Sequence, residues 1–282
     1  MIIKAYAKIN IGLHILGARP DGYHNLETVF HRIKIIDTIL LEPAKTLSFW
    51  CESTDVPKDA SNLCLQAAHL LARESGSNLG AKITLTKQIP VGAGLGGGSS
   101  DAASTLLGLN KFWGLKLSLS KLQSIALELG SDVPYFLQTG SALATGRGEV
   151  LDYFTMDLPF WILLVSPKIQ VSTTWAYSRL SPSERATNSL TKSLLITSVR
   201  QTRKFPNPVS NDFEQPIFDQ YPEIKHLKES LSNAGAVYAS MSGSGSAVYG
   251  FYSDPGQVES ISSELGSRYR VYLTPPHFQP EQ

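Results

Sequence analysis

The chain has 282 residues, of which 42% are hydrophobic and 17% charged, so it can form one large or two medium domains around a sizeable core. Its formal net charge of +1 gives no electrostatic reason to bind nucleic acid, and no apolar run approaches the ~20 residues of a membrane span. Cys51 and Cys64 lack metal or redox spacing, and the six histidines lack metal-ligand spacing. The composition therefore indicates a soluble cytoplasmic protein of enzyme size.

Hydrophobic patterning predicts both strands and helices in the N-terminal half. The expected elements are, in chain order, strands at 2–16 and 28–41, a helix at 62–73, a strand at 82–85, a helix after residue 101 and a helix at 120–129. The turn signal Asp21-Gly22 separates the first two strands, whereas Ser120 caps the last helix and Gly130 ends it.

The C-terminal half continues this mixture of elements. The expected elements are a strand at 161–165, a helix at 221–233 ended by Gly235, two strands within 236–252, a helix at 257–265 and a strand at 269–274. The polar segment 181–208 has no pattern that predicts an element. Because strands and helices do not alternate strictly, an α+β fold is favoured over a doubly wound sheet.

A glycine-rich loop that opens a helix is the most informative motif. It comprises Pro90, Val91, Gly92, Ala93, Gly94, Leu95, Gly96, Gly97, Gly98, Ser99 and Ser100, and is called the glycine loop below. Its backbone N–H groups lie at the positive end of a helix dipole, which is a site for phosphate, and Ser99, Ser100 and Asp101 are expected to cap the helix.

Two other phosphate-binding motifs fit the glycine loop poorly. Gly92, Gly94 and Gly97 match G-x-G-x-x-G, but Pro90 separates them from the preceding strand and no acidic residue stands at the ribose position. The lysine position of a Walker loop holds Gly98. A flexible linker is the remaining alternative, although such linkers are not normally followed by a helix start of this kind.

Four further segments carry candidate chemistry, each with a plainer alternative. Lys8 and Asn10 share one face of the first strand, either as an active pair or as a solvated face. Asp132 is a candidate proton acceptor or a helix N-cap. The loop from Ser242 to Ser246, called the Ser-Gly loop below, allows a close backbone approach or forms an ordinary hairpin turn. Tyr23-His24 beside the first turn could bind a base or lie exposed.

Together these segments resemble the GHMP kinase superfamily over nearly the whole chain. The resemblance rests on Ala7-Lys8-Ile9-Asn10, residues 19–28, 90–101 and 130–136, Gly146-Arg147-Gly148-Glu149, Val171-Ser172-Thr173 with Tyr177, Asn211-Asp212-Phe213-Glu214 and residues 241–245. It implies two α+β domains, 1–151 and 152–282, with the active site between them. The Tyr23-His24 segment narrows the implied substrate to a cytidine diphosphate compound of isoprenoid precursor biosynthesis.

The resemblance also implies residue roles. Asp132 would accept the proton of the substrate hydroxyl, and Lys8 would keep that carboxylate ionised and stabilise the transition state. Residues 90–100 would wrap the phosphates of ATP, with Ser99 or Ser100 reaching Mg²⁺. The implied substrate contacts are Asn10 on the diphosphate or sugar-alcohol end, Tyr23 and Tyr177 sandwiching the cytosine, His24 on its polar edge and Thr173 nearby. Trp175 competes with Tyr177 for the stacking role.

Partners and alternatives complete these expectations. We expect a monomer or weak homodimer that acts on a small molecule, without nucleic-acid or membrane partners. A kinase of the same fold acting on homoserine, mevalonate or a sugar is the nearest alternative. A nucleotide-binding protein without turnover is the alternative from another class, but pure binding needs no proton acceptor such as Asp132.

Overall fold

The computed structural model describes residues 1–76, 79–180 and 209–281. The segment 181–208, for which the sequence predicts no element, lies outside the described residues. The chain divides into two compact units, each built from separate stretches of sequence. The first unit comprises Met1–Ala7, Ile35–Val91 and Gly96–Thr139, and the second comprises Lys8–Lys34, Gly92–Leu95 and Gly140–Gln282. The boundary expected between residues 151 and 152 stays a prediction.

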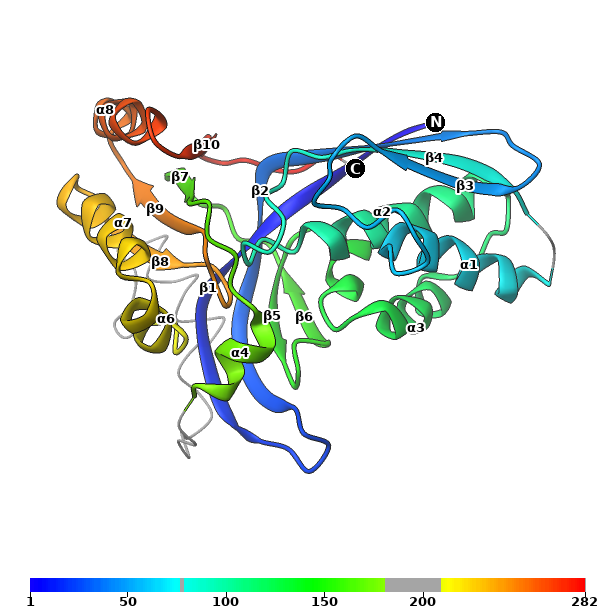
Figure 1. The fold of residues 1–282 in the computed structure, drawn as a ribbon, viewed down its shortest axis with the longest axis horizontal. Helices are drawn as coiled ribbons and strands as arrows, with labels where there is room; N and C mark the ends of the chain where they lie inside the picture. The colour runs from blue at the N-terminus through cyan, green and yellow to red at the C-terminus, as the bar shows by residue number, and fades with distance from the viewer. Residues whose placement is uncertain (77–78, 181–208, 282) are drawn as a thin grey trace. The chain divides into compact units, whose positions relative to one another are not determined.

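The first unit packs helices against a small sheet. Strand β4 (Ala81–Thr86) pairs in parallel with β3 (Leu47–Cys51) and antiparallel with the second half of β2 (His24–Glu42). Helices α1 (Leu63–Ser75), α2 (Gly97–Phe112) and α3 (Leu119–Leu129) lie along one side of β3 and β4 (Figure 1), followed by the short 3₁₀ helix η1 (Val133–Leu137). Helices α1 and α3 each bury an apolar stripe, and α2 buries every residue from Ser100 to Leu106, which holds the layer together.

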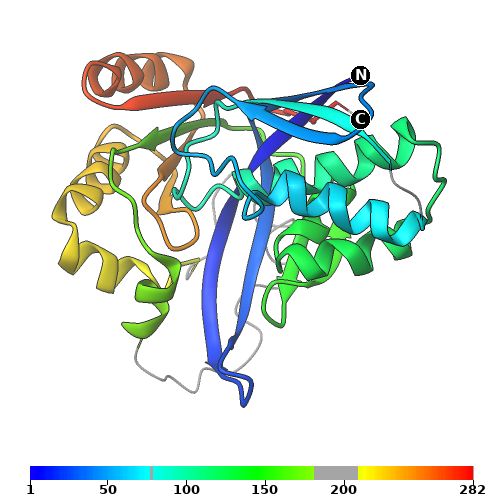
Figure 2. The same cartoon turned by 45° about the vertical axis from the view of Figure 1, so that its right-hand side comes forward.

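The second unit contains an antiparallel four-stranded sheet in the order β10-β7-β9-β8. These strands are β7 (Trp161–Ser166), β8 (Tyr238–Met241), β9 (Val248–Tyr252) and β10 (Arg270–Thr274). Helices α6 (Glu214–Gln220), α7 (Pro222–Asn233) and α8 (Pro255–Gly266) accompany the sheet, and Figure 2 shows α7 and α8 beside it. Their apolar faces form one core with the sheet, in which Phe213, Ile217 and Leu231 are fully buried.

Two long strands contribute to both units. Strand β1 (Ile2–Ala18) pairs with β2, and the first half of β2 pairs with β5 (Ser141–Thr145), which in turn pairs with β6 (Val150–Phe154). Among the described residues, no helix is both long and apolar enough to cross a membrane. The same residues contain no group of three His, Cys, Asp or Glu side chains arranged to hold a metal ion.

The expected elements are present, with shifted ends and several additions. Asn62 caps α1 rather than opening it, because its side chain accepts the Cys64 and Leu65 N–H groups. The expectation that Ser120 caps α3 is wrong, since Ser118 accepts the Lys121 N–H, whereas Gly130 ends the helix as expected. Sequence patterning did not predict β3, β5, β6, α6 or the short helix α4 (Thr173–Ser178).

Candidate active site

Lys8 and Asn10 form a buried polar pair on β1, on the shared face that their alternation predicts. The Lys8 side chain is 4% exposed, and its Nζ donates to Asn10 Oδ1 at 2.5 Å and to the Gly94 carbonyl at 3.3 Å. The ammonium also lies 4.9 Å from the centre of the Phe30 ring. The alternative of a solvated strand face is therefore excluded.

Contacts around Asn10 fix its amide in one orientation. Its Nδ2 donates to Thr28 Oγ1 at 3.1 Å, which leaves Oδ1 facing Lys8. Its backbone N–H donates to Ser242 Oγ at 3.2 Å, and its carbonyl accepts the Tyr249 hydroxyl at 2.7 Å. The position of the lysine head group thus depends on hydrogen bonds from residues of β2, β9 and the Ser-Gly loop, all in the second unit.

The Ser-Gly loop packs directly on the second-unit part of the glycine loop. Ser242 Oγ donates to the Gly94 carbonyl at 2.9 Å, and the Ala247 N–H donates to the Ala93 carbonyl. A Cβ on Gly94 would stand 2.0 Å from the Ser242 carbonyl oxygen, so only glycine fits there. The Ser-Gly loop is a hairpin connection between β8 and β9 that also makes a close backbone approach, and the partner is the glycine loop.

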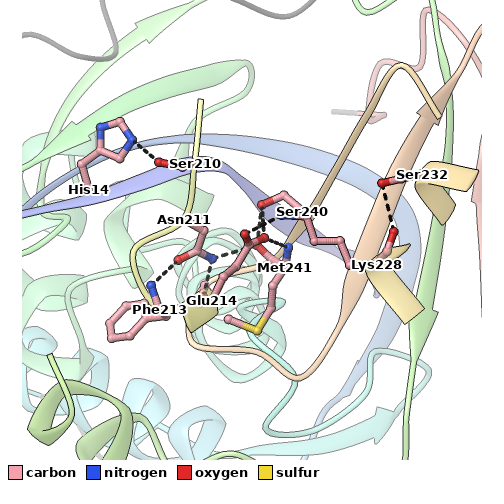
Figure 3. A network of polar contacts seen from close by, with 10 residues as sticks. His14, Ser210, Asn211, Phe213, Glu214, Lys228, Ser232, Ser240 and Met241 are labelled. Carbon is pink, nitrogen blue, oxygen red and sulfur yellow. Dashed lines mark hydrogen bonds and ion pairs between the residues drawn. The ribbon is translucent and has the colours of Figure 1, made fainter. Parts of the chain in front are cut away.

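A buried polar network holds the Ser-Gly loop in turn (Figure 3). Asn211 Nδ2 donates to the carbonyls of Met241 and Gly243 at 2.9 and 2.8 Å. Glu214 Oε1 accepts the Met241 N–H and the Ser240 hydroxyl, and Lys228 Nζ donates to Oε2 at 2.6 Å. The Asn211–Glu214 motif therefore acts structurally on a loop that touches Lys8's partners.

Helix α2 begins earlier than expected, and its first turn lacks a side-chain cap. Its N-cap is Gly96 in the left-handed region, with φ +67, and no side chain makes a capping hydrogen bond. The expectation that Ser99, Ser100 and Asp101 cap the helix is wrong, because all three lie inside it. Backbone N–H groups at the helix start thus have no cap side chain competing for them, which suits an anion.

Asp132 occupies the N-cap position of η1 in the first unit without acting as a cap. Its backbone has φ −82 and ψ −18, and its side chain makes no capping hydrogen bond. The plain capping role is therefore wrong, and the Asp132 side chain is half-buried. Lys8 belongs to the second unit and Asp132 to the first, so their pairing stays a prediction.

Aromatic and basic side chains gather near the turn that joins β1 and β2. The His24 ring stacks on Tyr177 with centroids 5.2 Å apart, and Tyr177 meets Phe213 edge-on. Tyr23 is 54% exposed, and the Arg147 guanidinium lies 4.7 Å from the centre of its ring. Two stacked pairs, His24 with Tyr177 and Tyr23 with Arg147, thus lie within the second unit.

The other two candidates near α4 have different surroundings. The Trp175 ring lies edge-on against Tyr221, and the Arg179 guanidinium covers it at 5.3 Å. Thr173 Oγ1 lies 3.2 Å from Ser244 Oγ, which links α4 to the Ser-Gly loop. The structure therefore brings Thr173 and Tyr177 close to other candidates and gives Trp175 its own partners.

Sequence reasoning did not single out Thr28, Ser242 or Arg147 as members of this region. Ser242 lay inside a recognised loop, but its contact with Gly94 spans 148 positions and no local pattern predicts it. Thr28 and Arg147 lay inside motifs that carried the family resemblance, which was the available signal.

Comparisons with known proteins agree with this geometry. The family model described as "GHMP kinases N terminal domain" matches residues 62–140, and the one described as "GHMP kinases C terminal" matches residues 203–271. A 4-diphosphocytidyl-2-C-methyl-D-erythritol kinase of Chlorobium chlorochromatii is 45% identical over 99% of this chain and 97% of its own length. The chain belongs to the 4-diphosphocytidyl-2-C-methyl-D-erythritol kinase family of GHMP kinases. The resemblance seen in the sequence motifs is thereby confirmed.

Solved structures support the same assignment of fold. A crystal structure of a 4-(cytidine 5'-diphospho)-2C-methyl-D-erythritol kinase matches with a TM-score of 0.84 and 32% identity, covering 97% of this chain and 98% of that one. The mevalonate kinase of Methanococcus jannaschii matches with a TM-score of 0.68 at 14% identity over 98% of both chains, which shows the shared fold alone. The expected α+β GHMP kinase fold is confirmed, and as a member of this kinase family the chain uses ATP.

Proposed function

We propose that this enzyme transfers the γ-phosphoryl group of ATP to the 2-hydroxyl of 4-(cytidine 5′-diphospho)-2-C-methyl-D-erythritol, in the non-mevalonate synthesis of isoprenoid precursors. The observation that carries the proposal is the buried Lys8–Asn10 pair held against the Gly94 carbonyl. The full-length similarity to relatives of that name supports the choice of substrate. We expect a cytoplasmic monomer or weak homodimer that binds no nucleic acid.

The glycine loop, residues 90–100, is proposed to hold the phosphates of ATP. The start of α2 offers N–H groups that no cap side chain occupies, at the positive end of the helix dipole. A bound Mg²⁺ would neutralise phosphate charge during transfer. The residues present fit such an ion, because Mg²⁺ is usually held by substrate phosphates with few protein oxygens, here the hydroxyl of Ser99 or Ser100.

Lys8 and Asp132 are proposed as the catalytic residues. The substrate hydroxyl oxygen forms a bond to the γ-phosphorus while the bond from that phosphorus to the β,γ-bridging oxygen breaks, and ADP leaves. The hydroxyl proton passes to the Asp132 carboxylate. The Lys8 ammonium stabilises the negative charge on the transferring group, and its hydrogen bond to Asn10 keeps it in place.

The cytidine end of the substrate is proposed to lie near the turn between β1 and β2. Tyr23 and Tyr177 offer ring faces, His24 a hydrogen-bonding edge and Thr173 a nearby hydroxyl, with Asn10 closer to the reacting end. The contact between His24 and Tyr177 favours Tyr177 over Trp175, whose ring lies against Tyr221 instead. A stacked base contributes ~1–3 kcal/mol of binding free energy whatever its identity, so the hydrogen-bonding edge of His24 is proposed to distinguish cytosine from other bases.

Transfer of labelled phosphate from ATP tests the proposal directly. We expect transfer to the cytidyl substrate and none to mevalonate or homoserine. ATP binding without transfer to any acceptor would instead support a nucleotide-binding protein without turnover. Lys8→Met and Asp132→Asn should each lower kcat by about 10²–10⁴ with ATP affinity retained. Lys34→Met, an exposed lysine on β2, is the matched control and should retain wild-type rates. Wild-type kcat in either catalytic variant would contradict the assigned roles.

A further inference from the structure

Three charged side chains are buried together beneath the two ends of the glycine loop. Lys87 Nζ donates to Asp37 Oδ2 at 2.5 Å and to Asp101 Oδ2 at 2.8 Å. The exposed fractions of the side chains are 7% for Lys87, 0% for Asp37 and 4% for Asp101. All three belong to the first unit, and none has a role in the phosphoryl transfer described above.

The contacts of this triad reach both the entry and the exit of the glycine loop. Asp37, on β2, accepts the backbone N–H groups of Gln88 and Ile89 on one oxygen, at 2.5 and 2.9 Å. These residues immediately precede Pro90, where the loop begins. At the other end, Asp101 lies in the second turn of α2, so Lys87 ties the loop entry to the helix that the loop opens.

Packing at the helix start depends on the same lysine. A Cβ on Gly97, the first residue of α2, would stand 2.9 Å from Ile89 Cγ2 and 3.1 Å from Lys87 Nζ. The lysine side chain therefore runs directly against the first turn of the helix. Moving it would move the N–H groups that the proposed function assigns to the phosphates of ATP.

Burying Asp101 in the triad carries an energetic cost, which the ion pair with Lys87 only partly offsets. Burial raises the pKa of Asp101 to about 7, with Lys87 opposing and Asp37 reinforcing the rise. Asp101 Oδ1 is buried without a hydrogen-bond partner among the described residues. Burial lowers the pKa of Lys87, but the two carboxylates more than offset this and keep it charged. Cys64 of α1 also faces the triad, and burial raises its pKa, so the thiol adds no countercharge.

Buried ion pairs replaced by apolar groups of similar shape are often as stable or more stable. A charged cluster at this place thus has a positional effect that an apolar one would lack, namely two oriented carboxylates bonded to one fixed ammonium. We propose that Asp37, Lys87 and Asp101 are positioning residues that fix both ends of the glycine loop and so aim its N–H groups at the phosphates of ATP. This inference rests on the proposed role of the glycine loop.

Two variants of graded severity test the triad. The triple variant Asp37→Asn, Lys87→Met, Asp101→Asn removes every charge while keeping the side-chain volumes. The amide oxygen at position 37 can still accept the Gln88 and Ile89 N–H groups, so the variant should fold. Its KM for ATP should rise about 10-fold, while its KM for the cytidine substrate stays within 2-fold. Asp101→Asn alone keeps the neutral Asp37–Lys87 pair, so it should fold and should raise the KM for ATP about 3-fold.

A binding measurement separates phosphate positioning from general distortion. By calorimetry, affinity for a non-hydrolysable ATP analogue should fall about 10-fold in the triple variant, while affinity for adenosine stays unchanged. The matched control is Glu42→Gln with Lys82→Met, which removes an exposed ion pair between β2, the strand of Asp37, and β4, the strand that Lys87 follows. That control should change neither KM value nor either affinity.

The outcomes distinguish a failure of the triad's positioning role from a failure of the proposed function. Wild-type affinity for the ATP analogue in a folded triple variant, or equal rises in both KM values, would overturn the positioning role. If the triple variant does not fold, an unchanged KM for ATP in Asp101→Asn overturns it. A wild-type enzyme that binds the analogue but transfers no phosphate to the cytidine substrate would overturn the proposed function, and the affinities would still test the triad.

Discussion

Gly94→Ala tests whether the close approach of the Ser-Gly loop restricts position 94 of the glycine loop to glycine. Gly94 has φ +76, and an added Cβ would stand 2.0 Å from the Ser242 carbonyl oxygen and 3.2 Å from that of Gly245. Gly92 offers a matched control, because it has φ +68 but its nearest atom, Gln170 Cγ, is 3.8 Å away. Alanine at either position meets the same backbone strain, and only at Gly94 does it also overlap another backbone.

The magnitudes follow from these two terms. A non-glycine residue in the left-handed region costs ~1–2 kcal/mol, offset by ~0.4–1 kcal/mol from the less flexible unfolded chain. Gly92→Ala should therefore lower the free energy of unfolding by about 1 kcal/mol. Gly94→Ala adds the relief of an overlap against backbone, for which overpacking typically costs ~1–3 kcal/mol. The difference between the variants should be about 2 kcal/mol.

Urea unfolding followed by tryptophan fluorescence measures this difference, and steady-state kinetics report its consequence. Displacing Gly94 moves the carbonyl that accepts from Lys8 and from Ser242, so kcat should fall at least ~10-fold in Gly94→Ala, the equivalent of about 1.4 kcal/mol. Equal losses of stability in the two alanine variants would refute the reasoning, because the strain that they share would then account for everything.

Three further predictions concern other parts of the second unit and the two thiols. Burial lowers the pKa of His31 from 6.5 to about 4, so the stability that its neutral form contributes is complete above pH 6.5 and is lost as the pH falls toward 4. The loss amounts to about 3 kcal/mol of the free energy of unfolding. The unfolding temperature of a His31→Asn variant should therefore depend less on pH over that range than that of the wild type. Tyr177→Ala should raise the KM for the cytidine substrate about 10-fold and Trp175→Ala less than 2-fold, and the reverse order would place the base on Trp175. Cys51 and Cys64 are buried, so neither should react with an aromatic disulfide reagent before the protein unfolds, and rapid labelling of the native enzyme would contradict their burial.

Local patterns in the sequence predicted the features that depend on one segment. The two-residue period of a strand predicted that Lys8 and Asn10 share a face, and their hydrogen bond confirms it. The glycine loop was correctly predicted to open a helix. Its cap was not, because Gly96 in the left-handed region takes the N-cap position and lets the helix begin at Gly97, before the serines.

Features that depend on contacts between distant segments could not be predicted in this way. Asp37 falls in an alternating strand, where a carboxylate usually indicates the solvent face, and Lys87 follows a strand end. Their contact spans 50 positions and appears only once β2 and β4 are paired. Strand β5 is short and rich in alanine, so its pairing with β2 rather than its own propensity makes it a strand.

Several physical constraints require glycine in the glycine loop, although the sequence suggests only one, the close approach of a phosphate. A side chain would keep a phosphate away from the backbone, and this reason applies most simply to Gly92, which has open space around it. At Gly94 and Gly97 a side chain would meet the protein itself, namely the Ser242 carbonyl and the Lys87 head group with Ile89. Internal packing thus restricts these two positions even in the absence of nucleotide. Substitutions at Gly94 should therefore disturb the fold and the catalysis together, whereas substitutions at Gly92 should act mainly through backbone strain and ATP.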